Sequence, residues 1–342
     1  GAGGGGVVEG CTGGAGVGGW CARGWAGAQA VAVRSDGTGE TVAALADPDL
    51  VGERAVGDRV ALNVSALERG LGTGGFALVV ALPDHLPADP PSTPGHLVKA
   101  RYTPMQTMVL GVDEQESEHY GALADADDLL GMPCVVADLH SALPAIIAGL
   151  RHAARREGLA PPRVAYVMTD GGALPAWFSR TVAGLREAGW LETCITVGQA
   201  FGGDLEAVNV HTGLLAARHV STADVTVVTQ GPGNLGTGTR WGFSGVAAGE
   251  AINAVSALRG RPIAALRISG ADERSRHHGL SHHSLTAYGR VALTRADVVV
   301  PDLSASPDPA LAALGVQVDL QVAALGGRSR GHRLVRVPIT DL

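Results

Sequence analysis

The chain has little of what a nucleic-acid-binding protein needs. Lys99 is the only lysine, no block of basic residues occurs, and the formal net charge is −7. Binding to nucleic acid requires a positively charged stripe that neutralises phosphates. The composition therefore predicts no nucleic-acid partner. The use of arginine for nearly every positive charge is explained by the base composition of the genome.

Aromatic residues are also scarce, at 4% of the chain, whereas glycine is abundant, with 50 residues. Because 46% of the residues are hydrophobic, a chain of 342 residues can bury a substantial core, and disorder of the whole chain is excluded. This core must be built from Val, Leu, Ile and Ala. A sheet covered by helices fits such a composition.

Cysteine is rare, and no C-x-x-C pair occurs among Cys11, Cys21, Cys134 and Cys194. Isolated cysteines of this kind are usually buried like small hydrophobic residues and remain reduced. This pattern predicts a cytoplasmic location. No apolar run approaches the length that crosses a membrane. The N-terminus lacks the basic start and the apolar middle of a signal peptide, so we expect no membrane partner.

The sequence suggests two domains and a linker. Residues 1–26 are dominated by glycine and are expected to be disordered. Residues 27–82 alternate short strand-like runs with turn signals, which predicts a small antiparallel β-barrel-like domain. Residues 83–95 contain five prolines and are interpreted as a linker. The remainder, residues 96–342, forms the larger domain.

In this larger domain strand-like runs alternate with helix-like ones. The runs VKARYT and TMVLGVDE come first, followed by PCVVAD, RVAYVMTD, TCITVG, DVTVVTQ, PIAALRIS and DVVVP. Helices are expected at residues 142–155, 174–188, 205–220 and 244–258. Apolar runs without alternation that are joined by helices predict an α/β fold with an open, mostly parallel sheet and helices on both faces.

Polar residues follow these predicted strands, where ligands bind in open parallel sheets. We expect the catalytic residues to be Asp138, His140, Asp170, His282 and His283. The expected ligand-binding residues are Gly202, Gly203, Asp204, Gly231, Gly233, Asn234, Gly236, Thr237, Gly238, Thr239 and Arg267. Because all these groups follow parallel strands, the sequence predicts one crevice.

Several of these residues also have a purely structural interpretation. Ser141 and Asp170 stand where the N-cap of a helix belongs, and Gly202 to Asp204 would be a turn that ends in the next N-cap. Residues 231–239 lie between a strand-like run and a helix, so their backbone N–H groups are expected to bind an anion. The same residues match neither the phosphate loop nor the dinucleotide turn.

A cluster of histidines, His277, His278, His282 and His283, leaves three interpretations open. A metal site is one, with Asp138, His140 and His211 as further ligands, but the spacing H-E-x-x-H is absent. Because adjacent histidines on a strand or helix point to different faces, at most half of the four are expected to meet one ion. In the second interpretation the histidines transfer protons or bind an anion. In the third they are ordinary surface residues. We assign no metal ligand, and the cofactor is unknown.

Six segments carry a resemblance to a family. They are GHLVKARYTPMQTMVLGVDEQES (95–117), VADLHSALPAI (136–146), AYVMTDGGALPAWFSRTV (165–182), TVGQAFGGDLEAVNVHTGLLAA (196–217), QGPGNLGTGTRWGFSG (230–245) and GLSHHS (279–284). With these the chain resembles the bacterial domain-of-unknown-function family 3866 of actinobacteria and Firmicutes, over residues 42–293. The resemblance implies no activity and no role for any residue.

Two functions remain as hypotheses. The first is an enzyme that acts on a small anionic metabolite, phosphorylated or not, with residues 231–239 holding the anion and Asp138 or Asp170 transferring protons with a histidine. The second is a non-catalytic ligand-binding or scaffolding protein that uses the same crevice. Perturbed pKa values in the crevice would favour the enzyme. A homo-oligomer is an option that the sequence leaves open.

Overall fold

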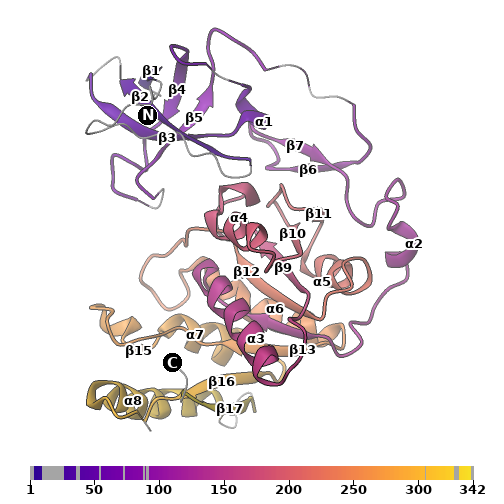
Figure 1. Ribbon diagram of the computed structural model, residues 1–342, viewed down its shortest axis with the longest axis vertical. Helices are drawn as coiled ribbons and strands as arrows, with labels where there is room; N and C mark the ends of the chain where they lie inside the picture. Colours follow the sequence, from indigo (N-terminus) through magenta and orange to yellow (C-terminus); the bar gives the residue numbers. More distant parts are fainter. Residues whose placement is uncertain are drawn as a thin grey trace. The chain divides into compact units, whose positions relative to one another are not determined.

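The computed structural model describes residues 4–9, 27–35, 39–53, 55–71, 74–87, 89, 92–304, 306–326 and 331–339, with only the backbone for 4–9. The chain divides into two compact units, Gly1–Thr93 and Pro94–Leu342 (Figure 1). Each unit is described by itself. The proline-rich linker expected at residues 83–95 stays a prediction.

The first unit is a closed barrel of five strands in the order β1-β2-β3-β5-β4. The strands are β1 (Gly4–Glu9), β2 (Gln29–Ser35), β3 (Thr41–Ala46), β4 (Arg59–Asn63) and β5 (Ala77–Ala81), and the short helix α1 (Pro48–Val51) follows β3. Neighbours are antiparallel except β3 and β5, which pair in parallel. Disorder was therefore the wrong expectation for Gly4–Glu9, while residues 1–3 and 10–26 lie outside the described residues.

The second unit is built on an eight-stranded sheet in the order β11-β10-β9-β12-β8-β13-β16-β17. The strands are β8 (Pro133–Val136), β9 (Val164–Thr169), β10 (Thr193–Val197), β11 (Leu205–Ala207), β12 (Val225–Gln230), β13 (Arg261–Ala265), β16 (Asp297–Asp302) and β17 (Arg333–Pro338). All neighbours pair in parallel. The α/β fold with a preceding barrel is therefore confirmed.

Helices cover both faces of this sheet because its strands are apolar on both sides. The helices are α2 (Tyr120–Leu123), α3 (Leu143–Arg156), α4 (Arg180–Glu187), α5 (Val210–His219), α6 (Ala247–Ala257), α7 (His282–Thr286) and α8 (Pro309–Gly326), and 3-10 or π turns add η1 (His140–Ala142), η2 (Ala176–Phe178), η3 (Ser244–Val246), η4 (Ser275–His277) and η5 (Ala287–Val291). One core joins α3 and α4 to residues such as Tyr166 and Met168. The other joins α5, α6 and α8 to residues such as Val136 and Val167.

Two segments differ from the expected parallel pattern. The runs VKARYT and TMVLGVDE do not enter the large sheet, because β6 (Leu97–Lys99) and β7 (Thr107–Val109) pair with each other as an antiparallel hairpin. The helix expected at residues 205–220 is shorter, since residues 205–207 form the edge strand β11 and α5 begins after its N-cap Asn209.

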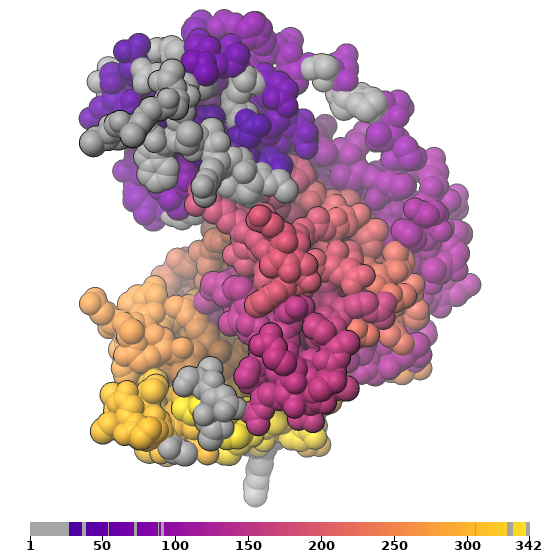
Figure 2. All heavy atoms as spheres, in the orientation of Figure 1, coloured from indigo at the N-terminus to yellow at the C-terminus, as the bar shows by residue number. Residues whose placement is uncertain are grey.

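One helix of the described residues, α8, is long and apolar enough to cross a membrane by length and composition, with a mean hydropathy of 1.3. The expectation that no apolar run approaches this length is therefore wrong. Helix α8 connects the parallel strands β16 and β17, and its buried Val318, Val322 and Leu325 join the core of this unit. Its outer side, coloured yellow in Figure 2, lies at the surface and exposes Leu320.

Candidate functional site

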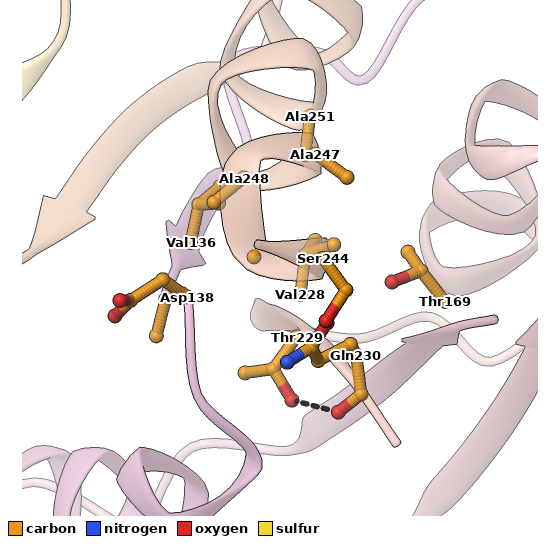
Figure 3. Close-up of a pocket in the computed structure, with 12 residues that line it drawn as sticks. Val136, Asp138, Thr169, Val228, Thr229, Gln230, Ser244, Ala247, Ala248 and Ala251 are labelled. Atoms are coloured by element: carbon orange, nitrogen blue, oxygen red, sulfur yellow. Dashed lines mark hydrogen bonds between the residues drawn. The ribbon is translucent and has the colours of Figure 1, made fainter. Parts of the chain in front are cut away.

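The candidate site lies where the chain changes direction across the sheet. Strands β8 and β12 are neighbours, but β8 leads through α3 to β9 while β12 leads through α6 to β13 on the opposite side. Ligands bind at such switch points, beyond the carboxyl ends of the strands. A small pocket lies there, and Figure 3 shows several of its lining residues, among them Asp138, Thr169, Gln230 and Ser244.

Asp138 follows β8 and is buried, with 3% of its surface exposed. Figure 3 shows its carboxylate pointing away from Gln230 and Ser244. On that side Oδ2 lies 3.7 Å from Nδ1 of His283. Burial raises the pKa of Asp138 to about 6, against the opposing field of Arg267.

A hairpin brings the histidines to the same edge. The strands β14 (Ile268–Ser269) and β15 (Gly279–Leu280) pair antiparallel, so the chain returns to the end of β13, the neighbour of β8. The backbone N–H of Ser281 donates to the carbonyl of Arg267 over 2.9 Å. The Ser281 hydroxyl then caps α7 by accepting from the N–H of His283.

Three of the four histidines meet there. One ring nitrogen from each of His277, His282 and His283 lies within 4.8 Å of the others, and His277 and His283 are buried. The fourth, His278, is exposed. The expectation that at most half of the four could meet is therefore wrong, and so is the surface interpretation for His277 and His283.

Burial controls the protonation of these histidines. Burial, followed by Arg267 and Arg274, lowers the pKa of His277 to about 4, and burial, followed by the neighbouring His282 and His277, lowers the pKa of His283 to about 3. Burial, followed by Arg276 and Arg267, also lowers the pKa of His282. The three imidazoles are therefore neutral at pH 7, the form in which histidine binds metal ions.

Two arginines border the histidines. Arg267 follows β13, is half-buried, and lies with Nη2 3.3 Å from a carboxylate oxygen of Asp272. Arg276 is exposed, and its guanidinium lies 3.8 Å from the position that a Cβ on Gly238 would take. The positive charges of both arginines act on His282 and His283.

Residues 231–239 are folded more tightly than a phosphate cradle. Gly236 and Phe243 form an antiparallel bridge, and the N–H of Thr237 donates to the carbonyl of Gly242. The side chain of Asn234 accepts hydrogen bonds from Gln230 and Ser244. Because α6 begins only at Ala247, after the turn η3, the loop does not run straight into the helix.

This loop nevertheless reaches the histidines. Beyond Thr239, the ring of Phe243 stacks on the imidazole of His283, with centroids 3.8 Å apart. Gly238 has a φ of +80°, in the left-handed region, whereas Gly236 does not. Gly231 is buried, while Gly233, Asn234, Thr237 and Thr239 are exposed or half-buried. The structure thus brings the loop, Asp138, Arg267, His282 and His283 together.

His140 is turned away from this cluster. Its Nδ1 lies 3.0 Å from the hydroxyl of Tyr166, and its Nε2 lies 2.7 Å from the hydroxyl of Ser179. Burial lowers its pKa to about 4. Both ring nitrogens are thus occupied inside the core, as in a structural histidine. Ser141, in the turn η1, is not a helix cap.

Asp170 follows β9 but serves the neighbouring loop. Its Oδ2 accepts a hydrogen bond from the backbone N–H of Gln199 over 2.8 Å, after the end of β10. It does not cap a helix, because α4 begins at Arg180 with Ser179 as its N-cap. The structure thus keeps Asp170 at the carboxyl edge without joining it to the histidines.

The turn of Gly202, Gly203 and Asp204 lies elsewhere. The Asp204 carboxylate accepts from the N–H of Cys194, near the start of β10, so it lies toward the amino ends of the strands. The N–H of Gly202 donates to Glu206, and that of Gly203 donates to Thr196. These residues close the turn before β11, and the single crevice does not include them.

A second buried ionic group, Lys99 and Glu206, provides a comparison. Lys99 donates to the carbonyls of Ala200 and Ala207, and Nζ lies 3.6 Å from Glu206 Oε2. Glu206 also accepts from Thr196 Oγ1. Burial lowers the pKa of Lys99 and raises that of Glu206, while their mutual attraction opposes both shifts. This group is fully hydrogen-bonded, so it holds β6 against β10 and β11.

The Asp138 cluster is not satisfied in this way. Three of the buried side-chain atoms that have no hydrogen-bond partner among the described residues belong to this cluster, namely Asp138 Oδ2, His282 Nε2 and His283 Nδ1. A buried polar atom without a partner costs about 1 to 3 kcal/mol. Three such atoms in one place indicate a position for a ligand, and these residues together with His277 are those that could hold a metal.

Sequence reasoning missed three participants. Phe243 and Arg276 were not assigned to the site, and His277 was named in the cluster without a role. The signal for His277 and Arg276 is their position five and six residues before His282. No signal in the sequence indicates that Phe243 stacks on an imidazole.

Comparison with known proteins gives a family and no activity. A family model described as "Protein of unknown function (DUF3866)" matches residues 43–339. No curated protein and no solved structure matches the chain. Because the family model covers most of both units, the chain belongs to the DUF3866 family.

Proposed function

We propose that this protein is an enzyme that acts on a small anionic metabolite at the carboxyl ends of β8, β12 and β13. The observation that carries the proposal is the buried carboxylate of Asp138 at the switch point of the sheet, whose Oδ2 lies 3.7 Å from Nδ1 of His283. Perturbed carboxyl and imidazole groups that face one another in a cleft are typical of catalytic sites.

The charges around the cluster favour an anionic ligand. Arg276 is exposed and Arg267 is half-buried, and the charges of both act on His282 and His283. The guanidinium groups can bind a carboxylate or a phosphate with two parallel hydrogen bonds. Because His277, His282 and His283 are neutral at pH 7, they do not supply this charge themselves.

In this proposal Asp138, His282 and His283 contact the reacting part of the substrate. Asp138, with a pKa of about 6, is ionised at pH 7 and is matched to accepting a proton, whereas the imidazole of His283, with a pKa of about 3, is too weak a base for this role. Arg276 and the loop around Gly238 bind the anionic end. The free thiols of Cys134 and Cys194 are buried, and a cytoplasmic location is part of the proposal.

The experiment uses the full chain and a panel of phosphorylated and carboxylated metabolites. Binding is measured by thermal shift, and turnover by mass spectrometry of the mixture. We expect at least one compound to be converted, with turnover lost in Asp138→Asn and affinity lowered in Arg276→Ala. Arg163→Ala, at the amino ends of the strands and paired with Asp224, is the control.

One result would contradict the enzyme, and two others would contradict the roles of Asp138 and Arg276. Binding without conversion of any bound compound would favour the non-catalytic ligand-binding protein. Full turnover in a folded Asp138→Asn variant would place the chemistry elsewhere. A substrate whose affinity falls equally in Arg276→Ala and Arg163→Ala would remove the role of Arg276.

A further inference from the structure

We infer that His277, His282, His283 and Asp138 form a binding site for a divalent transition-metal ion, for which Zn²⁺ is the probe. The inference goes beyond the proposed function, since metal binding can be measured without any substrate. It stands on the positions of the four side chains and on their unpartnered atoms.

The distances suit one ion. Zinc lies about 2.0 to 2.1 Å from histidine nitrogen and about 2.0 to 2.2 Å from carboxylate oxygen. Two ligand atoms at a tetrahedral angle are then roughly 3.3 Å apart. Asp138 Oδ2 and His283 Nδ1 are 3.7 Å apart, and the ring nitrogens of the three histidines lie within 4.8 Å of one another. The three histidines form the group that meets this distance, and Asp138 adjoins it through His283.

The hydrogen bonds leave the required atoms open. Nδ1 of His277 lies 2.8 Å from the hydroxyl of Ser281, which leaves Nε2 available to an ion. A second ring hydrogen bond of this kind is usual for a histidine that binds a metal, because it fixes the ring and its tautomer. His282 Nε2, His283 Nδ1 and Asp138 Oδ2 have no partner among the described residues.

A network of histidines that hydrogen-bond one another does not explain the cluster. The ring centroids of His282 and His283 lie 4.5 Å apart, yet their buried nitrogens do not pair. The Lys99 and Glu206 group shows that buried ionisable side chains of this protein can satisfy one another, since its members all find partners. An ion is the ligand that satisfies three acceptor atoms at once.

The donor set restricts the metal. Imidazole and carboxylate together suit zinc, iron, copper and nickel, whereas calcium and magnesium prefer oxygen ligands. Cys134 is buried in a strand, and burial raises the pKa of its thiol to about 12, so it does not compete as a thiolate. One carboxylate and three neutral imidazoles leave a divalent ion with net positive charge, which an anionic substrate held by Arg276 would balance.

The test is a titration of the full chain, after removal of metal by a chelator, with Zn²⁺ alone. Calorimetry is expected to give about one ion per chain. X-ray absorption is expected to show a shell of nitrogen and oxygen at about 2.0 to 2.1 Å with no sulfur. His282→Ala should raise the dissociation constant about 100-fold or more, because it removes a direct ligand where loss of a supporting contact already costs about 10-fold to 100-fold.

The matched control is His278→Ala, which changes the exposed neighbour and should leave the affinity unchanged. Circular dichroism establishes that both variants fold, and Asp138→Asn gives an independent second variant. Equal Zn²⁺ affinities in His282→Ala and His278→Ala would overturn the inference, as would a sulfur shell or the absence of saturable binding. Stoichiometric binding without turnover would leave the metal site standing and contradict the proposed enzyme instead.

Discussion

The ring of Phe243 lies parallel to the imidazole of His283, with ring centroids 3.8 Å apart and an interplanar angle of 3°. Phe243 closes the glycine-rich loop through its bridge to Gly236, and His283 faces Asp138. The stack therefore links the loop that follows β12 to the hairpin that follows β13. It also fixes the plane of the imidazole and hence the direction of Nδ1.

The first prediction concerns this stack. Phe243→Leu keeps an apolar side chain and should cost less than about 1.5 kcal/mol in stability. The imidazole then loses its flat neighbour, so we expect the dissociation constant for Zn²⁺ to rise about 10-fold, as for other supporting contacts. Phe201→Leu, at the buried ring that packs edge-on against Trp177, is the matched control. An affinity that changes equally in both variants would show that the stack does not orient His283.

The second prediction separates two glycines of one loop. Gly238 has a φ of +80°, and its added Cβ would approach Arg276, whereas a Cβ on Gly236 would meet only a carbonyl oxygen at 3.9 Å. Gly238→Val should therefore strain the backbone by about 1 to 2 kcal/mol and displace Arg276. We expect inorganic phosphate to bind more weakly to Gly238→Val and normally to Gly236→Ala, measured by calorimetry. Equal affinities would remove the loop from the ligand site.

The sequence predicts the parallel strands and Asp138 for a physical reason. A run such as PCVVA is buried on both faces, so it has to be an inner strand, and the first carboxylate after it lies at the carboxyl edge. The same rule fails for Asp204. There, residues 205–207 pair with β10 as a short strand instead of starting a helix, which moves the preceding turn toward the amino ends.

Side-chain direction was the part that the sequence could not specify. His140 follows β8 closely, yet the turn η1 points its ring into the core, toward Tyr166. His277, His282 and His283 converge because η4 and α7, to which they belong, flank the strand β15. The rule for adjacent residues on one regular element fails within α7, where His282 and His283 both join the cluster.

The third prediction tests the structural role of His140. In His140→Phe the hydroxyls of Tyr166 and Ser179 each lose one hydrogen bond, which costs about 0.5 to 1.5 kcal/mol apiece, while their bonds to Gln230 and Val182 remain. The midpoint of thermal unfolding should fall. Zn²⁺ affinity should stay close to that of the parent protein, because His140 does not face the cluster. A large loss of affinity in a folded variant would return His140 to the site.

The last prediction concerns the opposite edge of the sheet, where Asp297 joins three strands. Its carboxylate accepts from Arg261 at the start of β13 over 2.7 Å and from Arg333 at the start of β17. Hydrogen bonds from Arg333 and Arg261 hold the pKa of Asp297 below its ordinary value. A carboxyl group with a lowered folded-state pKa stabilises the fold fully above its unfolded pKa of about 3.9, and this contribution is lost as the pH falls further.

Asp297→Asn should therefore lower the midpoint of thermal unfolding by a constant amount above about pH 5, and the difference from the parent protein should shrink as the pH falls below about 4. The double variant Arg261→Gln/Arg333→Gln removes the cause of the shift. In that double variant, the further change Asp297→Asn should leave the pH dependence of the unfolding midpoint unchanged. If the difference between the parent protein and Asp297→Asn stays constant down to about pH 3, or survives in the double variant, the two arginines do not stabilise the carboxylate. The amino edge of β13, β16 and β17 would then be held by its backbone pairing alone.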